Sequence, residues 1–552
     1  MRRETKQMVS LAALAVGTAM PVAAQDRLNQ ANPAIVERAL PQPSRPRDER
    51  EPSITAPPPL VGNQQPRAVA LTVSAIVVDG AAELPAGTFT AAILPYIGRG
   101  LSTADLSTLA QAVAGAARSA GFPFASAWIA PQDLTAGILR VRLDAGTLSA
   151  VRVIGAASPA ADRLLSRALV TGRAVRRDEL ERAILLVGDM PGITVKESRY
   201  VRQDGFGILL VTIAEDRASA YAQVDNRGSR EVGPYRATVL ANVRNIAQSG
   251  DEIGLIASLT PVQPSEFAFV RGRYAAPVDD RGSMLTASGS YGRAHPGASL
   301  TALNVIGQSG DAAVAYVRPL LRSRLHSLWT GLEVRALRSD QTLLGRPLRN
   351  ERLSTLTASL SGSMEAAGGV LRGEAAMVAG LPLPGVTHQD DARKSRSDGD
   401  ARFVLWTYNA DWTTSLTDRV GIVIATAAQL ASRPLLATME IGAGGPAFGR
   451  GYDFAERTGD KGILGSADLR IDTGKVRGLV DRVQLYGSID GGYVDNLRGG
   501  SGGGTLLSSA LGARLGRGRS SGMVELAFPL NADRFDTRNR TPRLSVRLSR
   551  AF

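Results

Sequence analysis

Few residues of this 552-residue chain have the types and spacing that catalysis requires. The run at 518–522 (Gly-Arg-Ser-Ser-Gly) matches the G-x-S-x-G pattern of a nucleophilic serine. That chemistry needs a buried strand before the serine and a helix after it. Here the segment that follows, Met523 to Phe528, predicts a further strand. We therefore interpret the run as part of a turn and not as a hydrolase site.

The sequence also lacks the residue patterns of a metal site and of a nucleotide-binding loop. His295, His326 and His388 lie far apart and cysteine is absent, so the ligand spacing of a catalytic metal site is missing. The glycine-rich run at 442–445 could approach a phosphate, but no Gly-Lys-Ser/Thr follows it. The sequence predicts no enzyme activity, no cofactor and no metal.

The composition favours a chain that crosses a membrane with strands. Its mean hydropathy is -0.02, too polar for a bundle of helices that each need about 20 consecutive apolar residues. A β-barrel is compatible with this value, because only alternate residues face lipid. The net charge of +13 invites a nucleic-acid partner. However, the arginines are spread over the whole length with few aromatics, so we expect them to line a lumen or face anionic lipid, with no nucleic acid bound.

The N-terminal segment has the pattern of an export signal. Basic residues precede a short apolar stretch from Met8 to Ala19, and small residues follow. We predict a signal peptide at 1–24, which places the mature protein beyond the inner membrane. Residues 25–68 predict a short helix at 32–40, with Pro33 in its first turn, and then a proline-rich linker.

Two small α/β units follow, at 69–147 and 148–216. In the first, a strand at 71–80 precedes a helix that starts at a Ser102–Asp105 capping box, and two strands follow. The second unit repeats the order strand–helix–helix–strand–strand. An exposed sheet edge in such a unit could add an extended strand from another polypeptide.

The remainder, 217–552, predicts a barrel. From about Ala218 the apolar residues recur at every second position, as Trp406, Tyr408 and Trp412 do between polar residues. One face is apolar and the other is small and polar, which is typical of lipid outside and a wet lumen inside. Roughly 335 residues accommodate about sixteen antiparallel strands of about ten residues with turns and loops. The chain ends in an alternating strand that finishes on Phe552.

The first unit contains three short motifs, Gly121-Phe122-Pro123-Phe124, Pro131-Gln132-Asp133-Leu134 and Gly137-Ile138-Leu139. Together they resemble the first POTRA domain of two-partner secretion transporters (TpsB), the ShlB/FhaC/HecB-like family within the BamA superfamily. One departure is Asp144-Ala145-Gly146, where the family usually has Glu-Gly. The resemblance implies that the region of Phe122, Phe124, Gln132 and Leu134 contacts a secreted polypeptide.

Motifs in the barrel resemble the same family. Asp225, Asn226 and Gly228 match a D-N-x-G turn after the first strand, and Gly459-Asp460 begins a G-D-x-G run. Gly449-Arg450-Gly451-Tyr452 is similar to the V-R-G-Y/F tip of the inward-folded sixth loop, with Gly449 in place of the usual aliphatic residue. In the family, the loop arginine reaches an aspartate on the inner wall, and the resemblance implies that Asp490 is this partner. A guanidinium and a carboxylate can pair bidentately in a narrow lumen.

The resemblance implies an outer-membrane β-barrel preceded by two periplasmic POTRA domains, through which a partner exoprotein passes to the cell surface. The implied partners are the unfolded secretion domain of that exoprotein, outer-membrane lipid or lipopolysaccharide, and the barrel-assembly machinery that reads the strand ending at Phe552. It also implies that the helix at 32–40 plugs the barrel. An insertase of BamA or TamA type is the main alternative, although those chains usually carry three to five POTRA units. A solute porin carries none.

Overall fold

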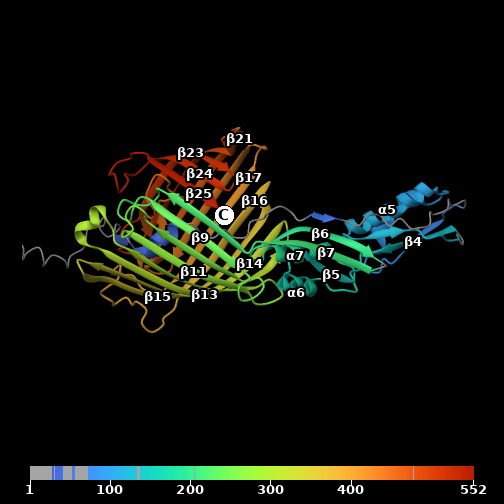
Figure 1. Ribbon diagram of the computed structural model, residues 1–552, viewed down its shortest axis with the longest axis horizontal. Coiled ribbons are helices and arrows are strands. Elements are labelled where there is room, and N and C mark those ends of the chain that lie inside the picture. The colour runs from blue at the N-terminus through green and yellow to red at the C-terminus, as the bar shows by residue number, and fades with distance from the viewer. Residues whose placement is uncertain are drawn as a thin grey trace, which may run out of the picture.

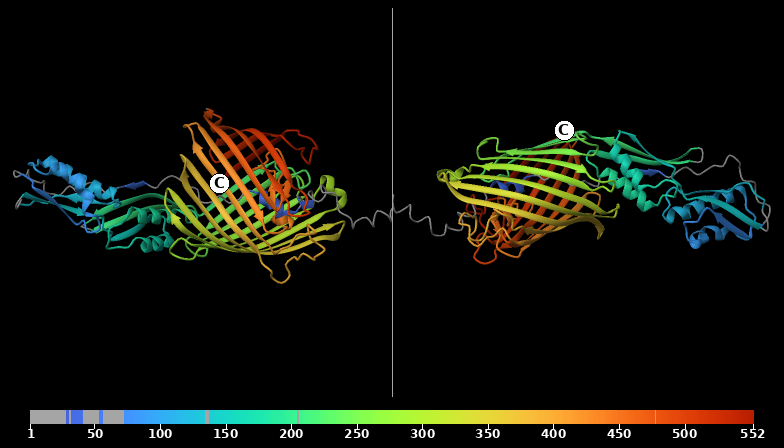
Figure 2. Two further views of the ribbon diagram at one scale, coloured as in Figure 1. Left: turned by 180° about the vertical axis from the view of Figure 1, so that it is seen from behind. Right: turned by 90° about the horizontal axis from the view of Figure 1, so that it is seen from below.

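The computed structural model describes residues 28–29, 32–40, 53–55, 72–133, 137–203, 206–476 and 478–552. Two small α/β units lie in a row at one end of a large cylinder of strands (Figure 1). The two views of Figure 2 place the second unit between the first unit and the cylinder. No described helix is long and apolar enough to cross a membrane. The predicted signal peptide at 1–24 lies outside the described residues.

The first unit packs one long helix against a three-stranded sheet. Its strands β2 (Ala75–Asp79), β4 (Ile138–Asp144) and β3 (Ser126–Trp128) lie in that order. Helix α5 (Thr103–Ser119) starts at the predicted capping box, where the Asp105 amide donates to the Ser102 hydroxyl and the Ser102 amide donates to the Asp105 carboxylate. Hydrogen bonds from Ser102 hold the pKa of Asp105 below its usual range. Three short helical turns precede α5: η3 (Ala86–Phe89), α4 (Thr90–Ile93) and η4 (Leu94–Tyr96).

The second unit has two helices on one face of a sheet, in the predicted order. Its strands and helices are β5 (Ala150–Gly155), α6 (Pro159–Ala168), α7 (Arg177–Gly188), β6 (Ile193–Gln203) and β7 (Phe206–Glu215). The strand order is β1-β6-β7-β5, in which β1 (Ser53–Thr55) joins the edge of β6 in parallel. The backbone of the predicted linker therefore contributes one strand to this sheet.

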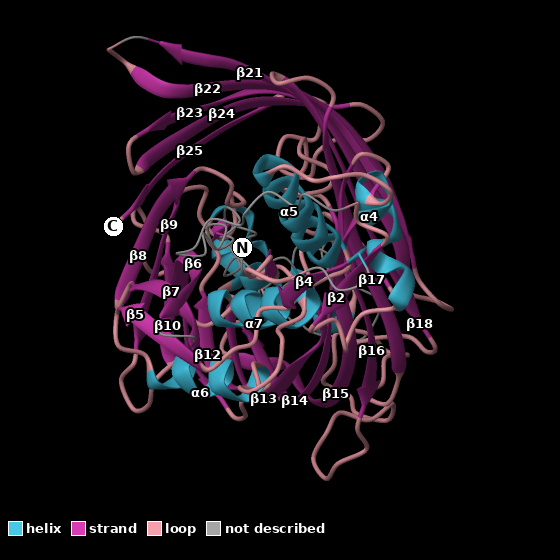
Figure 3. Ribbon diagram, turned by 90° about the vertical axis from the view of Figure 1, so that its right-hand side faces the viewer, coloured by secondary structure: helices cyan, strands magenta, loops and turns pink. Residues whose placement is uncertain are grey.

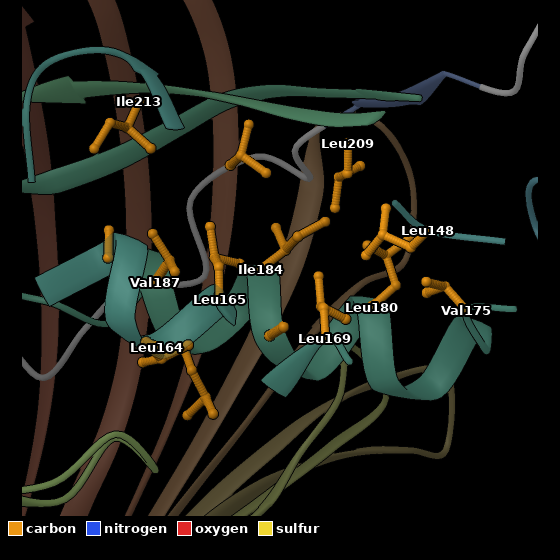
Figure 4. Close-up of a cluster of buried hydrophobic side chains, with 14 of the residues drawn as sticks. Leu148, Leu164, Leu165, Leu169, Val175, Leu180, Ile184, Val187, Leu209 and Ile213 are labelled. Carbon is orange, nitrogen blue, oxygen red and sulfur yellow. The ribbon is translucent and has the colours of Figure 1, made fainter. Parts of the chain in front are cut away.

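The core of the second unit is apolar and closely packed. Leu165 on α6 and Ile184 on α7 face Leu209 and Ile213 of the sheet (Figure 4). Each of these four side chains is no more than 2% exposed. The core arises because the apolar residues of both helices recur at helical spacing on the face toward the sheet.

Shortening one core side chain is expected to loosen this unit. Ile184→Ala removes buried methyl groups and leaves a cavity, which costs roughly 2–5 kcal/mol of unfolding free energy. The measurement is the rate of trypsin cleavage within 148–216 of the detergent-folded protein. Val170→Ala is the matched control, because Val170 is 52% exposed in the same unit. Equal cleavage rates for the two variants would contradict the packing described above.

Polar contacts attach the second unit to the cylinder. The Arg322 guanidinium donates to both oxygens of Asp189, at 2.7 and 2.8 Å, and joins the end of α7 to the last residue of β13, beside a turn of the barrel. The Ala160 amide at the start of α6 donates to the Ser249 hydroxyl of another turn at 3.1 Å. The unit is therefore held over one mouth of the cylinder, which we call the near end. The opposite mouth is the far end.

The cylinder is a closed barrel of sixteen antiparallel strands, and the prediction of this fold is confirmed. Neighbours in the barrel are neighbours in sequence, except that β18 pairs with β21 and β25 closes on β8. The strands are β8 (Ala218–Asp225), β9 (Arg236–Arg244), β10 (Glu252–Leu259), β11 (Phe267–Pro277), β12 (Met284–Ala294), β13 (Ile306–Arg322), β14 (His326–Leu343), β15 (Arg346–Ala366), β16 (Gly369–Gly380), β17 (Val404–Ser415), β18 (Val420–Ala431), β21 (Lys461–Val476), β22 (Val480–Asp495), β23 (Gly504–Arg517), β24 (Ser520–Pro529) and β25 (Arg543–Ala551).

The view along the barrel shows a ring of strands with the small units in front of its mouth (Figure 3). Outward positions carry exposed apolar residues, such as Trp406 at 56% and Tyr408 at 48%. Several inward positions carry buried charges, such as Asp468 at 3% and Glu525 at 2%. This alternation follows from the two-residue period of a strand, and it gives the barrel an apolar outside and a polar lumen.

Candidate functional site

A hairpin between β18 and β21 folds into the lumen and carries the predicted arginine motif. Strands β19 (Ile441–Ala443) and β20 (Arg457–Gly459) form its stem, after the short turn η7 (Ala437–Met439). Gly449 has a φ of +89°, and a side chain there would lie 2.9 Å from the Gly444 backbone. This turn therefore requires glycine, which explains why the usual aliphatic residue is absent here. Gly451 leaves room for Pro529 on the barrel wall, 3.0 Å from the position of a Cβ.

Arg450 lies at the hairpin tip among three wall carboxylates. Its NH1 donates to Asp468 Oδ1 on β21 at 2.8 Å. The same nitrogen is 3.6 Å from Asp490 Oδ2 on β22, and Nε is 3.7 Å from Glu525 Oε2 on β24. The arginine is 8% exposed. Buried ions in such a cluster depend on each other, because removing one leaves its partners uncompensated.

Asp490 binds mainly the backbone of the hairpin. Its Oδ1 accepts hydrogen bonds from the amides of Gly449 and Arg450, at 2.6 and 2.8 Å, and from the Ser508 hydroxyl at 2.6 Å. The structure thus brings Arg450 and its predicted partner Asp490 together, but the carboxylate that accepts a hydrogen bond from the Arg450 guanidinium is Asp468. Asp468 and Glu525 were missed. Both could have been recognised in the sequence as acidic residues at positions of a predicted strand that face the lumen.

Tyr452 anchors the hairpin tip to the wall. Its side chain is 0% exposed and packs with Leu464, Val494 and Leu506. Its hydroxyl lies 3.1 Å from Asn531 Oδ1 and 3.1 Å from the Leu507 carbonyl. The tip is therefore fixed by an aromatic ring as well as by the charge cluster.

The Asp225-Asn226-Arg227-Gly228 motif lies where the first and last strands meet. The Asn226 side chain donates to the Leu544 carbonyl at 3.0 Å and accepts from the Val546 amide at 2.7 Å. These two hydrogen bonds extend the seam, by which we mean the pairing of β25 with β8 that closes the barrel. Only five residue pairs join the two strands there. A side chain on Gly228 would meet the Gly233 carbonyl at 1.8 Å, so only glycine fits this turn. Asp225 accepts from the Arg227 amide at 2.9 Å.

The motif is also connected to the arginine cluster. The Arg227 guanidinium donates to Glu525 Oε1, and Glu525 Oε2 lies 3.7 Å from Arg450. Tyr486 donates its hydroxyl to the same carboxylate at 2.7 Å. Glu525 therefore links the inward hairpin to the turn after the first strand.

Asn226→Ala is expected to weaken the barrel seam. The change removes two hydrogen bonds and leaves a carbonyl and an amide of β25 without these partners, at a cost of roughly 1–3 kcal/mol. The measurement is the temperature at which the folded band converts to the unfolded band in gel electrophoresis. Asn409→Ala is the control, because the Asn409 side chain is exposed and has no hydrogen bond to another described residue. If Asn226→Ala and the control converted at the same temperature, Asn226 would not stabilise the junction of the first and last strands.

The predicted helix at 32–40 lies within the lumen, as α3 (Pro33–Val36) and η2 (Glu37–Ala39) (Figure 1). Glu37 lies 3.4 Å from Arg271 and 3.3 Å from Arg335 on the wall. The Asn32 amide donates to Ser339 at 2.8 Å, and Arg38 donates to the Glu440 carbonyl at 3.0 Å. Each of these contacts uses a side chain, and the helix joins no strand of the barrel.

A second buried arginine, which the sequence did not single out, lies at the far end. Arg396 comes from the loop between β16 and β17, and its NH1 donates to Glu440, Asp460 and Asn496 at 3.0, 2.9 and 2.8 Å. Since Glu440 also binds Arg38, this network joins the far-end loop, the hairpin stem and the lumen helix. Asp460 belongs to the predicted G-D-x-G run. Nothing in the local sequence distinguishes Arg396 from neighbouring loop residues.

The predicted contact residues of the first unit are largely structural. Phe122 and Phe124 are 1% and 0% exposed, so, contrary to the prediction, neither is available to bind a polypeptide. Phe124 stacks on Tyr200 of the second unit, with ring centroids 4.5 Å apart. Gln132 is exposed, and its amide group both donates to and accepts from the backbone of Arg140. Leu134 lies outside the described residues.

The remaining sequence candidates lie on the barrel wall. Phe552 is 59% exposed, and its amide donates to the Ala220 carbonyl at 2.9 Å. Ser520 opens β24, so the run at 518–522 joins two strands and no helix follows it. Among the described residues, no group of three or more His, Cys, Asp or Glu side chains could hold a metal ion.

Comparisons with known proteins agree with this geometry. Residues 207–515 match the family described as haemolysin secretion/activation protein ShlB/FhaC/HecB, and residues 71–146 match the ShlB-type POTRA domain. The chain is 22% identical over 379 residues to the heme/hemopexin transporter protein HuxB of Haemophilus influenzae (strain 86-028NP), covering 67% of this chain and 66%, just under two thirds, of HuxB. It is 21% identical over 485 residues to the outer membrane transporter CdiB of Escherichia coli O6:K15:H31 (strain 536 / UPEC), covering 83% of this chain and 79% of CdiB. The solved structure of CdiB from Escherichia coli has a TM-score of 0.69 at 19% identity, covering 98% of this chain and 100% of that chain.

Proposed function

The chain belongs to the haemolysin secretion/activation family ShlB/FhaC/HecB, and on that premise we propose that it is the pore through which a partner exoprotein crosses the outer membrane. The near end, with its two POTRA-type units, faces the periplasm, and the far end faces the cell surface. The unfolded N-terminal secretion domain of the exoprotein binds the POTRA units and then enters the barrel. No nucleotide and no chemical step are involved, since folding at the surface draws the chain outward.

The observation that carries this proposal is the way the lumen is filled. The helix contacts the wall and the hairpin through its side chains, and the hairpin is held by buried polar groups and by Tyr452. The polar groups include the Arg450 cluster, the Arg396 network at the stem and an ion pair between Asp453 and Arg543 of β25. Neither belongs to the ladder of barrel strands. Both can leave the lumen without breaking the wall, which is what the passage of an extended polypeptide requires. In this proposal, residues 32–40 plug the resting pore.

Lipid and the assembly machinery are the other partners. The exposed apolar band of the outer wall faces outer-membrane lipid, including lipopolysaccharide. Phe552 at the exposed end of the last strand is the residue that we assign to recognition during barrel assembly. The domain limits that we propose are 69–147 and 148–216 for the two POTRA units and 217–552 for the barrel.

The test first asks whether a large exoprotein with an N-terminal secretion domain is encoded beside this gene, and then measures the export of that exoprotein. We expect deletion of the transporter to retain the exoprotein in the periplasm and the full chain to restore it to the medium. A chain without residues 69–147, produced at equal level, should restore neither binding of the secretion domain nor export. The control is the folded amount of an unrelated outer-membrane barrel, which should not change. Unchanged export together with loss of other barrels would identify an insertase of BamA type instead.

A further inference from the structure

Polar residues form a patch on the outside of the barrel near its extracellular end. The ladder places Arg293, Gln308, Asp340 and Asn350 in one row across β12 to β15. The adjacent row contains Tyr291, Gly310, Arg338 and Arg352. We call these eight residues the rim patch. Four consecutive strands thus bring three arginines onto one surface.

The rim patch faces outward, at the edge of the lipid band. Arg338 is on the same face of β14 as Leu332 and Val334, which are 49% and 50% exposed. Its own side chain is 59% exposed. Arg338 lies twelve residues from His326 at the periplasmic end of β14. At about 3.3 Å per residue and a tilt of about 40°, this is roughly 30 Å along the membrane normal, slightly more than the apolar band of about 25 Å. The guanidinium groups therefore stand at the level of the outer-leaflet headgroups.

The patch is positively charged and incompletely paired. Its one carboxylate, Asp340, accepts from Arg338 and from the Asn350 amide, both at 2.6 Å. Within the described part of the chain, the Arg293 and Arg352 guanidiniums have no hydrogen bond or ion pair. A guanidinium fork matches the oxygens of a phosphate group, and exposed arginines beside a membrane attract anionic headgroups.

The outer surface next to the arginines, on the side toward the membrane centre, carries small side chains. Gly289, Ala312 and Ala336 form the next row toward the membrane centre, and Gly310 lies among the arginines themselves. Larger exposed side chains border this strip, including Tyr291 at 51% and Val314 at 52%. A strip of small residues that begins beneath phosphate-binding groups can accept an acyl chain lying flat against the wall.

We propose that the rim patch is a binding site for the phosphorylated, acylated sugar headgroup of outer-leaflet lipopolysaccharide. Arg293, Arg338 and Arg352 bind its phosphates, Gln308 and Asn350 hydrogen-bond its sugars, and an acyl chain lies over Gly289 and Ala312. The site is on the lipid side of the wall, so it is separate from the lumen and from the path of the exoprotein.

The experiment compares lipid A binding to full-length protein in detergent, by native mass spectrometry and by titration. The probes are bisphosphorylated lipid A, fully dephosphorylated lipid A and inorganic phosphate. The test variant combines Arg293→Gln, Arg338→Gln and Arg352→Gln. The matched control combines Arg419→Gln, Arg517→Gln and Arg519→Gln, which removes three exposed charges at the periplasmic end. Heat-modifiability in gels identifies folded protein, and the single variant Arg352→Gln provides a test that disturbs no charge pair.

We expect the triple rim variant to bind bisphosphorylated lipid A about a hundredfold more weakly, and Arg352→Gln about fivefold more weakly. The control triple should bind like the wild type, and dephosphorylated lipid A should bind all four proteins equally weakly. Inorganic phosphate should not compete at millimolar concentration. The proposal is overturned if the rim variants retain binding, if the control triple loses as much, or if inorganic phosphate displaces the lipid.

Discussion

Replacing Arg450 with alanine is expected to reduce export of the exoprotein severely while the barrel still assembles. The change leaves Asp468, Asp490 and Glu525 buried around the site without their shared cation. Removing one partner of a buried charge cluster costs roughly 3–5 kcal/mol. That amount shifts the ratio of docked to undocked hairpin by more than about a hundredfold. The hairpin forms no strand of the barrel, so the wall itself keeps its hydrogen bonds.

Export and assembly are measured in the same cells. The exoprotein in the medium reports export, and the heat-modifiable band in the outer membrane reports assembly. Arg433→Ala is the matched control, because Arg433 is exposed in the loop before the hairpin and has no ion pair among the described residues. Arg450→Lys should restore export only in part, since lysine keeps the charge but lacks the planar fork. Normal export by Arg450→Ala would show that the charge cluster is not needed for secretion.

Removal of residues 25–40 is expected to raise the conductance of the purified pore severalfold. The helix lies in the lumen and is fixed there by Asn32, Glu37 and Arg38. Each contact reaches the wall or the hairpin through a side chain, and none closes the barrel. An open lumen lined by polar residues then conducts ions in proportion to its free cross-section.

Planar-bilayer recordings of the two proteins provide the measurement. Glu37→Gln is the intermediate variant, because it retains the helix but removes the charge that faces Arg271 and Arg335. We expect it to open more often than the wild type, with an open level equal to that of the shortened chain. Equal conductance with and without residues 25–40 would mean that the hairpin alone closes the pore.

The spacing of apolar residues was sufficient to predict the strands and helices of the fold, because that spacing shows which face of each element is apolar. Trp406, Tyr408 and Trp412 indicated a lipid-facing strand by their two-residue spacing alone. The capping box at Ser102 located the start of α5 to within one residue, because the cap depends only on neighbours three positions apart. The hairpin tip around Arg450 was expected from the resemblance of its motif to the family's sixth loop, and the structure shows that the backbone at Gly449 requires glycine.

Which side chains meet inside the barrel was decided only by the tertiary structure. Arg450, Asp468, Asp490 and Glu525 come from a loop and three strands, and only barrel closure and strand register bring them together. Register is set by the pairing of whole strands, and a slip of one residue would turn every inward carboxylate outward. The family resemblance implied that Asp490 is a neighbour of Arg450, but neither it nor the sequence showed that Asp468 lies closer to the guanidinium. Likewise, it could not show that Phe122 and Phe124 point into the core of a POTRA unit, because burial depends on what the rest of the chain packs against them.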